Sequence, residues 1–170
     1  MQTFEDFDKA VRLCVDAFNE WAKRMNPAAR ADHVCYKCAD SGEFEHVRAL
    51  FECRSQFVYQ SEIAGRRIAI IKFREPIATA LGEIWFFELS DQKPDGNQKS
   101  GFDHIEIYPV VGEAETLVEQ LSGNGAIFTK TVRPHHTTFD TAIAEGFGVR
   151  LEAGPLLETI KREMSQAAQG

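Results

Sequence analysis

Residues 31–34 are Ala-Asp-His-Val, and residues 102–105 are Phe-Asp-His-Ile. The two histidines, His33 and His104, lie 71 positions apart. Each one opens a strand-like stretch that is followed by a helical stretch and then by three more strand-like stretches. A pattern that recurs within one chain indicates two copies of the same supersecondary unit. The sequence therefore predicts two βαβββ modules.

The predicted modules cover residues 31–92 and 101–155. In the first, strands are expected at 33–38, 57–63, 67–73 and 84–89, with a helix at 43–54. In the second, strands are expected at 102–108, 127–132, 137–143 and 147–151, with a helix at 113–122. Glu75-Pro76 is expected to end the third strand, because proline cannot donate to a strand ladder. Residues 93–101 are dense in turn formers and predict an exposed connection between the modules.

Apolar residues recur every three or four positions between Phe4 and Trp21, which predicts an amphipathic helix before the first module. We expect an N-terminal helical segment at 1–28 and a single domain at 29–170 that closes with a C-terminal helix at 155–165. The predicted fold class is α+β. Its two modules should form a curved mixed sheet around one cleft, with an extra helix at each end.

The composition excludes several classes of partner. The chain has 170 residues, a net charge of −7 and a pI near 5.3, so it lacks the positive surface that binds nucleic acid or anionic membranes. No apolar run approaches the ~18 residues of a membrane span. The four cysteines, Cys14, Cys35, Cys38 and Cys53, contain one isolated C-x-x-C and no second knuckle. Free thiols of this kind predict a cytoplasmic protein.

A candidate metal site follows from the repeat. Each module begins with a histidine, His33 or His104, and ends with a strand-borne glutamate, Glu88 or Glu152. If a pseudo-twofold axis relates the modules, these four side chains converge. Two imidazoles and two carboxylates would neutralise a divalent cation and satisfy the buried acids. Such a set suits Ni, Co, Zn, Fe or Mn and leaves two positions open for water or substrate.

Several alternatives stay open around these residues. Glu106 shares a strand face with His104 and is a second candidate for a ligand or a general base. Glu152 fits equally a capping role at the start of the last helix. Asp32 and Asp103 should point away from the histidines that follow them, which favours turn or capping roles. The cations Arg66, Arg67, Lys72 and Arg74 either contact an anionic substrate or form a solvated edge.

The paired modules, with His33, Glu88, His104 and Glu152 in that order, resemble the vicinal-oxygen-chelate superfamily of glyoxalases, extradiol dioxygenases and epimerases. Within it, Ala31-Asp32-His33, the stretch 65–76 and Gly101-Phe102-Asp103-His104-Ile105-Glu106 are similar to the YecM family. The chain departs from the YecM pattern at Glu152, where a related sequence would have histidine.

The resemblance implies a metal-dependent lyase or isomerase that chelates two adjacent substrate oxygens, with Glu152 or Glu88 as the proton-transfer group. It also implies two alternatives. One is an extradiol-type dioxygenase with two histidines, one glutamate and Fe(II). The other is a metal-free protein that sequesters a small ligand. In related folds the site is built either within one chain or between the two chains of a homodimer.

Overall fold

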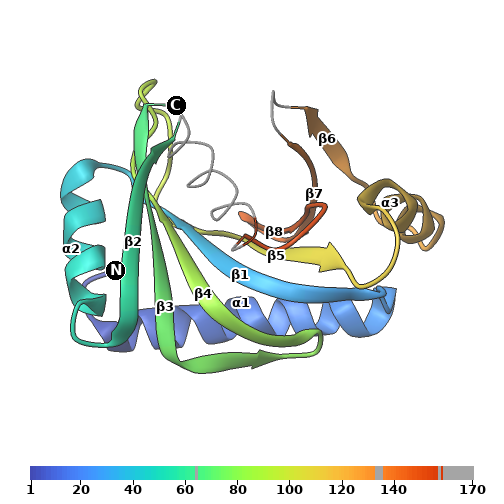
Figure 1. Ribbon diagram of the computed structural model, residues 1–170, viewed down its shortest axis with the longest axis horizontal. Coiled ribbons are helices and arrows are strands. Elements are labelled where there is room, and N and C mark those ends of the chain that lie inside the picture. Colours follow the sequence, from blue (N-terminus) through green and yellow to red (C-terminus); the bar gives the residue numbers. More distant parts are fainter. Residues whose placement is uncertain (64, 133–135, 157, 159–170) are drawn as a thin grey trace.

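The computed structural model describes residues 1–63, 65–132, 136–156 and 158 of the chain (Figure 1). Two consecutive βαβββ modules follow one long helix, α1 (Phe4–Met25). The first module consists of β1 (Ala29–Lys37), α2 (Ser41–Phe51), β2 (Ser55–Ile63), β3 (Arg66–Thr79) and β4 (Gly82–Ser90). The second consists of β5 (Gly101–Pro109), α3 (Ala114–Gly123), β6 (Thr129–Val132), β7 (Thr137–Ala144) and β8 (Phe147–Leu151). The predicted α+β class and repeat are confirmed.

All the described strands form one curved, mixed sheet of eight strands in the order β2-β3-β4-β1-β5-β8-β7-β6 (Figure 1). β1 and β5, the first strands of the two modules, pair antiparallel at its centre. Each of them pairs parallel with the last strand of its own module, β1 with β4 and β5 with β8. The sheet therefore has a pseudo-twofold arrangement, and the first strands of both modules lie side by side.

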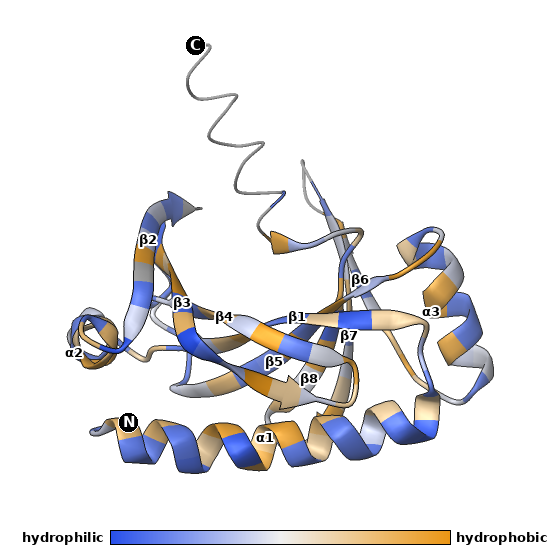
Figure 2. Cartoon of the chain, turned by 60° about the horizontal axis from the view of Figure 1, so that its bottom comes forward, coloured by the Kyte–Doolittle hydropathy of each residue, from blue (hydrophilic) through white to orange (hydrophobic). Residues whose placement is uncertain are grey.

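Helix α1 covers one face of this sheet (Figures 1 and 2). It begins with a capping box between Thr3 and Asp6, which satisfies backbone donors that a helix start leaves unpaired. Its buried side chains recur at helical spacing and include Phe7, Val11 and Phe18. They join one continuous hydrophobic core with residues from the sheet, α2 and α3. The opposite face of the sheet is left for the polar residues described below.

One prediction about the third strand of the first module is wrong. Glu75-Pro76 does not end β3, which continues to Thr79. Pairing between β3 and β4 shifts register between Lys72 and Ile77, and this irregularity contains the proline. A proline is tolerated at a bulge because its missing N–H is not needed by the ladder there.

The predicted C-terminal helix at 155–165 lies almost wholly outside the described residues. The boundary placed at residue 28 stays a prediction. No helix in the described ranges combines the length and the apolar character that crossing a membrane requires.

Candidate metal centre

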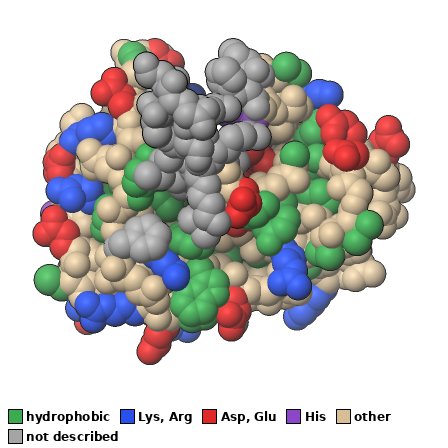
Figure 3. All heavy atoms as spheres, in the orientation of Figure 1, with side chains coloured by type: hydrophobic (Ala, Val, Ile, Leu, Met, Phe, Trp, Pro, Cys, Tyr) green, Lys and Arg blue, Asp and Glu red, His purple; other side chains and the backbone are tan. Residues whose placement is uncertain are grey.

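The two histidines of the repeat meet on the sheet face opposite α1. His33 lies on β1 and His104 on β5, and their exposed fractions are 0% and 2%. Their ring centroids are 6.0 Å apart. The antiparallel pairing of β1 with β5, in which Cys35 lies opposite His104, brings the rings together. Figure 3 shows acidic side chains on the molecular surface beside the grey atoms, whereas His33 and His104 themselves are buried.

A β-bulge accompanies each histidine. Between Ala31 and Val34, β1 advances three residues while its partner β5 advances two, so one residue is extra. On β5 the extra residue lies between His104 and Phe102. These two residues are two positions apart, but their partners on β1, Cys35 and Tyr36, are adjacent. The bulges fall at Asp32-His33 and at Asp103-His104. Bulges re-aim side chains and are frequent beside active sites.

These bulges overturn the predicted orientation of the two aspartates. Strict alternation would point Asp32 and Asp103 away from the histidines, but each carboxylate contacts the histidine that follows it. Asp32 Oδ2 lies 3.0 Å from His33 Nδ1, and Asp103 Oδ2 lies 2.8 Å from His104 Nδ1. Asp32 Oδ2 also accepts the backbone N–H of Leu156 at 2.9 Å. Both aspartates therefore orient imidazoles, a role that alternation did not predict.

Each imidazole has a second nitrogen without a partner. Among the described residues, neither His33 Nε2 nor His104 Nε2 has a hydrogen-bond partner, although both atoms are buried. His33 Nε2 is 3.6 Å from Glu88 Oε2, which is too far for a hydrogen bond. A buried, unpaired polar atom costs about 1–3 kcal/mol. Two such nitrogens, each on a ring held through Nδ1 by a carboxylate, fit the donors of a metal site.

Glu106 completes a compact group of ligand atoms. One ligand atom from each of His33, His104 and Glu106 lies within 4.8 Å of the other two. The Glu106 side chain is buried, and its Oε1 lies 3.7 Å from His33 Nδ1. It shares a face of β5 with His104, two residues earlier, as alternation predicted. The geometry thus favours the alternative ligand of the sequence analysis.

Glu88 borders the same group from β4. The register places it opposite Cys35, whose Sγ donates a hydrogen bond to Glu88 Oε1 at 3.2 Å. Cys35 in turn lies within 4.8 Å of ligand atoms of Asp103 and His104. Sequence reasoning did not include Cys35 in the site, although it lies two residues after His33 and so shares its strand face.

Glu152 follows β8, and its backbone N–H donates to Ile107 O at 3.1 Å. Its charge contributes to the raised pKa of Glu106. Its Oε1 is 4.0 Å from His136 Nε2, and it belongs to neither group of close ligand atoms found in the described part of the chain. His135, the residue before His136, lies outside the described residues.

The strand register explains why the two glutamates differ. Glu88 lies opposite Cys35 on the first strand of its module. The matching pair in the second module is Arg150 opposite Glu106. Arg150, not Glu152, therefore occupies the position that corresponds to Glu88. The sequence analysis did not include Arg150. Strand alternation could have identified it, because Arg150 and Glu152 are two positions apart and so share a strand face.

Burial and neighbouring charges shift the pKa values of the residues in this centre in different directions. Burial alone would lower the pKa of His33, but Glu106, Asp32 and Glu88 raise it well above the usual value. Burial raises the pKa of Glu106, and Glu152 adds to that rise. Burial also opposes ionisation of Glu88, yet His33 holds the pKa of that carboxyl well below its usual range. Burial lowers the pKa of His104 to about 4, so this imidazole is neutral at pH 7 and can act as a ligand.

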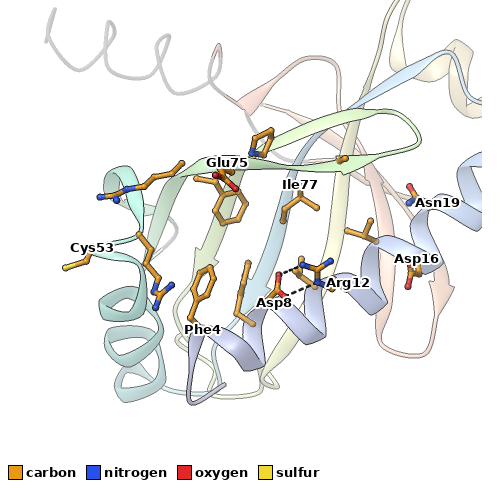
Figure 4. Close-up of a pocket in the computed structure, with 16 residues that line it drawn as sticks. Phe4, Asp8, Arg12, Asp16, Asn19, Cys53, Glu75 and Ile77 are labelled. Carbon is orange, nitrogen blue, oxygen red and sulfur yellow. Dashed lines mark hydrogen bonds and ion pairs between the residues drawn. The ribbon is translucent and has the colours of Figure 1, made fainter.

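A cavity of larger volume lies away from the histidines. It measures about 920 Å³ and runs between α1 and β3, on the opposite face of the sheet (Figure 4). Phe4, Phe7 and Ile77 line it, and the ion pair between Asp8 and Arg12 lies at α1. No group of close metal-ligand atoms among the described residues lies there. The volume of a cavity therefore does not by itself identify the candidate metal centre.

Paired βαβββ modules that bring two buried histidines and a glutamate together give the chain a glyoxalase-like α+β fold. The chain belongs to the YecM family, because the family model described as "YecM protein" matches residues 1–151. The resemblance to this family noted in the sequence is thereby confirmed.

The chain is also similar to individual known proteins. "Protein YecM" of Escherichia coli (strain K12) is 28% identical over 109 residues, which cover 61% of this chain and 56% of that protein. The chain thus matches little more than half the length of this curated relative. The solved structure "Structural Genomics, Protein EC4020" is similar with a TM-score of 0.73 and 21% identity, over 94% of this chain and 92% of that one. A methylmalonyl-CoA epimerase in complex with methylmalonyl-CoA and NH4+ gives a TM-score of 0.49 and 16% identity, over 76% and 96% of the two chains.

Proposed function

We propose that the protein is a divalent-metal-dependent lyase or isomerase of glyoxalase-like type, acting on a small substrate with two adjacent oxygens. One observation carries the proposal: two buried imidazoles, each anchored through Nδ1 by an aspartate, have unpaired Nε2 atoms, and their ring centroids are only 6.0 Å apart. Structural histidines normally satisfy both nitrogens. An unpaired pair beside buried carboxylates is typical of ligands.

His33, His104 and Glu106 would hold the cation, and Glu88 lies close enough to His33 to be the fourth ligand. Glu152 stays the alternative that the sequence predicted for that position. The donor set contains nitrogen and oxygen and suits Ni, Co, Zn, Fe or Mn. When bound, a divalent cation would supply Lewis-acid polarisation of a substrate carbonyl oxygen.

The chain's own residues account for proton transfer. A base in this reaction class takes a proton from the carbon next to a carbonyl. Glu88 Oε2 lies 3.6 Å from His33 Nε2, so this carboxylate is beside the position that a bound cation would take. Glu88 also borders a cavity of about 410 Å³, in which a substrate carbon could lie within its reach. We therefore assign the base to Glu88, with Glu152 as the alternative.

Other residues would position the reactants. Asp32 and Asp103 fix the imidazole orientations, and such partners affect metal affinity strongly. Ile68, Ile70 and Phe86 form a separate buried apolar cluster. Phe86 lies opposite His33 in the β1–β4 register, so this cluster adjoins the centre. An apolar wall of this kind excludes water from a proton-transfer site.

Metal analysis tests the proposal. Protein purified without a histidine tag should contain close to one divalent ion per chain. His33→Ala and His104→Ala should each lose it, while the control His46→Ala, on α2 and bonded to the Gln2 carbonyl, should retain it. Thermal unfolding of each variant checks that it folds. Substoichiometric metal that neither substitution changes would refute the proposal, and thermal stability insensitive to chelators would then favour a metal-free binding protein.

Two further predictions concern the cellular location and the oligomeric state of the protein. The cysteines Cys14, Cys35, Cys38 and Cys53 are all free, which supports a cytoplasmic, reducing location. We keep a homodimer as the proposed assembly. Size-exclusion chromatography with light scattering tests it, and a monomer at micromolar concentration would contradict it.

A further inference from the structure

A second feature of the same sheet face has a distinct chemistry. The cavity of about 410 Å³ beside the metal centre is bordered on one side by Cys35 and Glu88. Its other walls carry an unusual share of positive charge. The cationic lining residues are Lys37, Arg66, Lys93 and Arg150.

The charge of this cavity runs against that of the whole chain. Four cations face two carboxylates, Glu88 and Asp95, in a protein with a net charge of −7. Like charges gathered in a cleft repel one another and focus a positive potential there. Folding tolerates this arrangement more readily when an anion occupies the cleft. The local excess therefore points to a ligand of negative charge.

Two of the four cations have no carboxylate partner. Lys37 Nζ pairs with Asp103 Oδ1 at 2.5 Å, and Arg150 Nε pairs with Asp140 Oδ1 at 2.8 Å. Arg66 Nη1 instead donates to the neutral amide oxygen Gln98 Oε1 at 2.9 Å. Among the described residues, neither Arg66 nor Lys93 forms an ion pair. Their charges are thus available to a ligand.

The loop that carries Lys93 is held in place. Gln98 Nε2 donates to Cys38 O and to Asp91 O, both at 2.8 Å, and its Oε1 is the acceptor for Arg66. Gln92 Oε1 accepts the backbone N–H groups of Lys93 and Gln98. Gln98 therefore links the loop between the modules to the β2–β3 hairpin. Donors fixed before binding lose less entropy when a ligand arrives.

We infer that this cavity binds an anionic oxygen group, a carboxylate or a phosphate, of the substrate. The substrate class is then a small organic acid whose two adjacent oxygens reach the metal centre. This inference rests on the proposed function for the adjacent site, but the cavity itself does not need a metal. A guanidinium matches such groups with paired N–H donors, and an ammonium adds a point charge.

Calorimetric titration of chelator-treated, metal-free protein tests the inference. The probes are inorganic phosphate and succinate, which represent the two sources of anionic oxygen. Wild-type protein should bind at least one of them, and Arg66→Gln and Lys93→Gln should each weaken that binding about tenfold. The matched controls are Arg24→Gln and Lys23→Gln, both on the exposed side of α1, and they should leave affinity unchanged.

The outcomes separate the two proposals. Binding of phosphate alone identifies a phosphate-bearing substrate, and binding of succinate alone identifies a carboxylate. If neither probe binds the wild type more tightly than it binds the double variant R66Q/K93Q, the inference is overturned. Metal content measured on the same variants should equal that of the wild type. Loss of anion binding with metal retained is therefore distinct from failure of the metal proposal.

Discussion

Each buried histidine of the centre is preceded in the chain by an aspartate that binds its Nδ1. This contact decides which nitrogen remains available, because a neutral imidazole that donates from Nδ1 presents a lone pair at Nε2. The burial that lowers the pKa of His104 to about 4 keeps that lone pair free near neutral pH. The dipeptide Asp-His is therefore the smallest unit of the site.

Asp103→Asn tests this unit. The amide removes the negative charge that orients and polarises His104, so metal affinity should fall about tenfold to a hundredfold. Competition with a fluorescent chelator measures the affinity. Asp8→Asn, in an exposed ion pair on α1, is the matched control. Unchanged affinity in Asp103→Asn would show that the contact with His104 is only structural.

Glu43 is a residue whose effect depends on pH. Burial raises its pKa, but hydrogen bonds from Ser100, Ala39 N–H and Tyr36 outweigh burial and lower it below 4.5. A lowered folded-state pKa contributes stability above the unfolded value, and that stability is lost as pH falls through the folded value. Glu43→Gln should therefore cost about 1 kcal/mol at pH 7 and progressively less in acid.

Urea unfolding at pH 7 and at pH 3 measures this difference. Glu20→Gln, an exposed position on α1, should show little change at either pH. A cost for Glu43→Gln that stays constant between the two pH values would contradict the assignment.

The individual site residues were predictable to different degrees. His33, His104 and Glu106 follow from the repeat and from strand alternation. The roles of Asp32 and Asp103 do not, because a bulge breaks alternation locally and leaves no periodic trace in the sequence. The match of Arg150, and not Glu152, with Glu88 depends on the β5–β8 register, which no pattern within β8 reveals.

At the scale of elements, the second module depends on a close approach between β7 and β8. Gly148 on β8 pairs with His104 on β5 and with Ala142 on β7. A Cβ atom at this glycine would lie 2.7 Å from the backbone oxygen of Thr141. Since that neighbour is backbone, it cannot move aside cheaply.

Gly148→Ala should therefore destabilise the protein by about 1–3 kcal/mol, the usual cost of overpacking. It should also weaken metal binding, because β8 would shift against the strand of His104. Gly123→Ala, at the end of α3 with nothing within 4 Å of its added Cβ, should be near neutral. Denaturant unfolding compares the two, and equal stabilities would contradict the described packing.

Most elements were predictable because helical and strand periods differ clearly. The amphipathic α1 is an example, and so are the strands bounded by turn residues. The course of β3 beyond Pro76 was not predictable, since proline normally ends a strand and only pairing with β4 shows the irregularity that accepts it.

At the scale of the whole molecule, the proposed ligands come from both halves of the chain. His33 belongs to the first module, and His104 and Glu106 belong to the second. A cation held by all three would bind the folded protein alone and would stabilise both modules together.

Thermal unfolding with and without metal checks this. A metal present at a hundredfold excess over its dissociation constant should add about 2.7 kcal/mol and raise the melting temperature, and a chelator should reverse the rise. The double variant H33A/H104A should show no response. A chelator effect that persists in the double variant would place the stabilising metal elsewhere.

The one-residue insertions on β1 and β5 also constrain how this chain can change over evolutionary time. Loss of a single position between Ala31 and Val34, which both face the core, would straighten the strand and leave one side chain on the polar face, so that either the imidazole of His33 or the carboxylate of Asp32 would be lost. Replacing a neighbouring side chain would leave that geometry intact. Descendants of this protein can therefore accept substitutions near the imidazoles more readily than insertions or deletions.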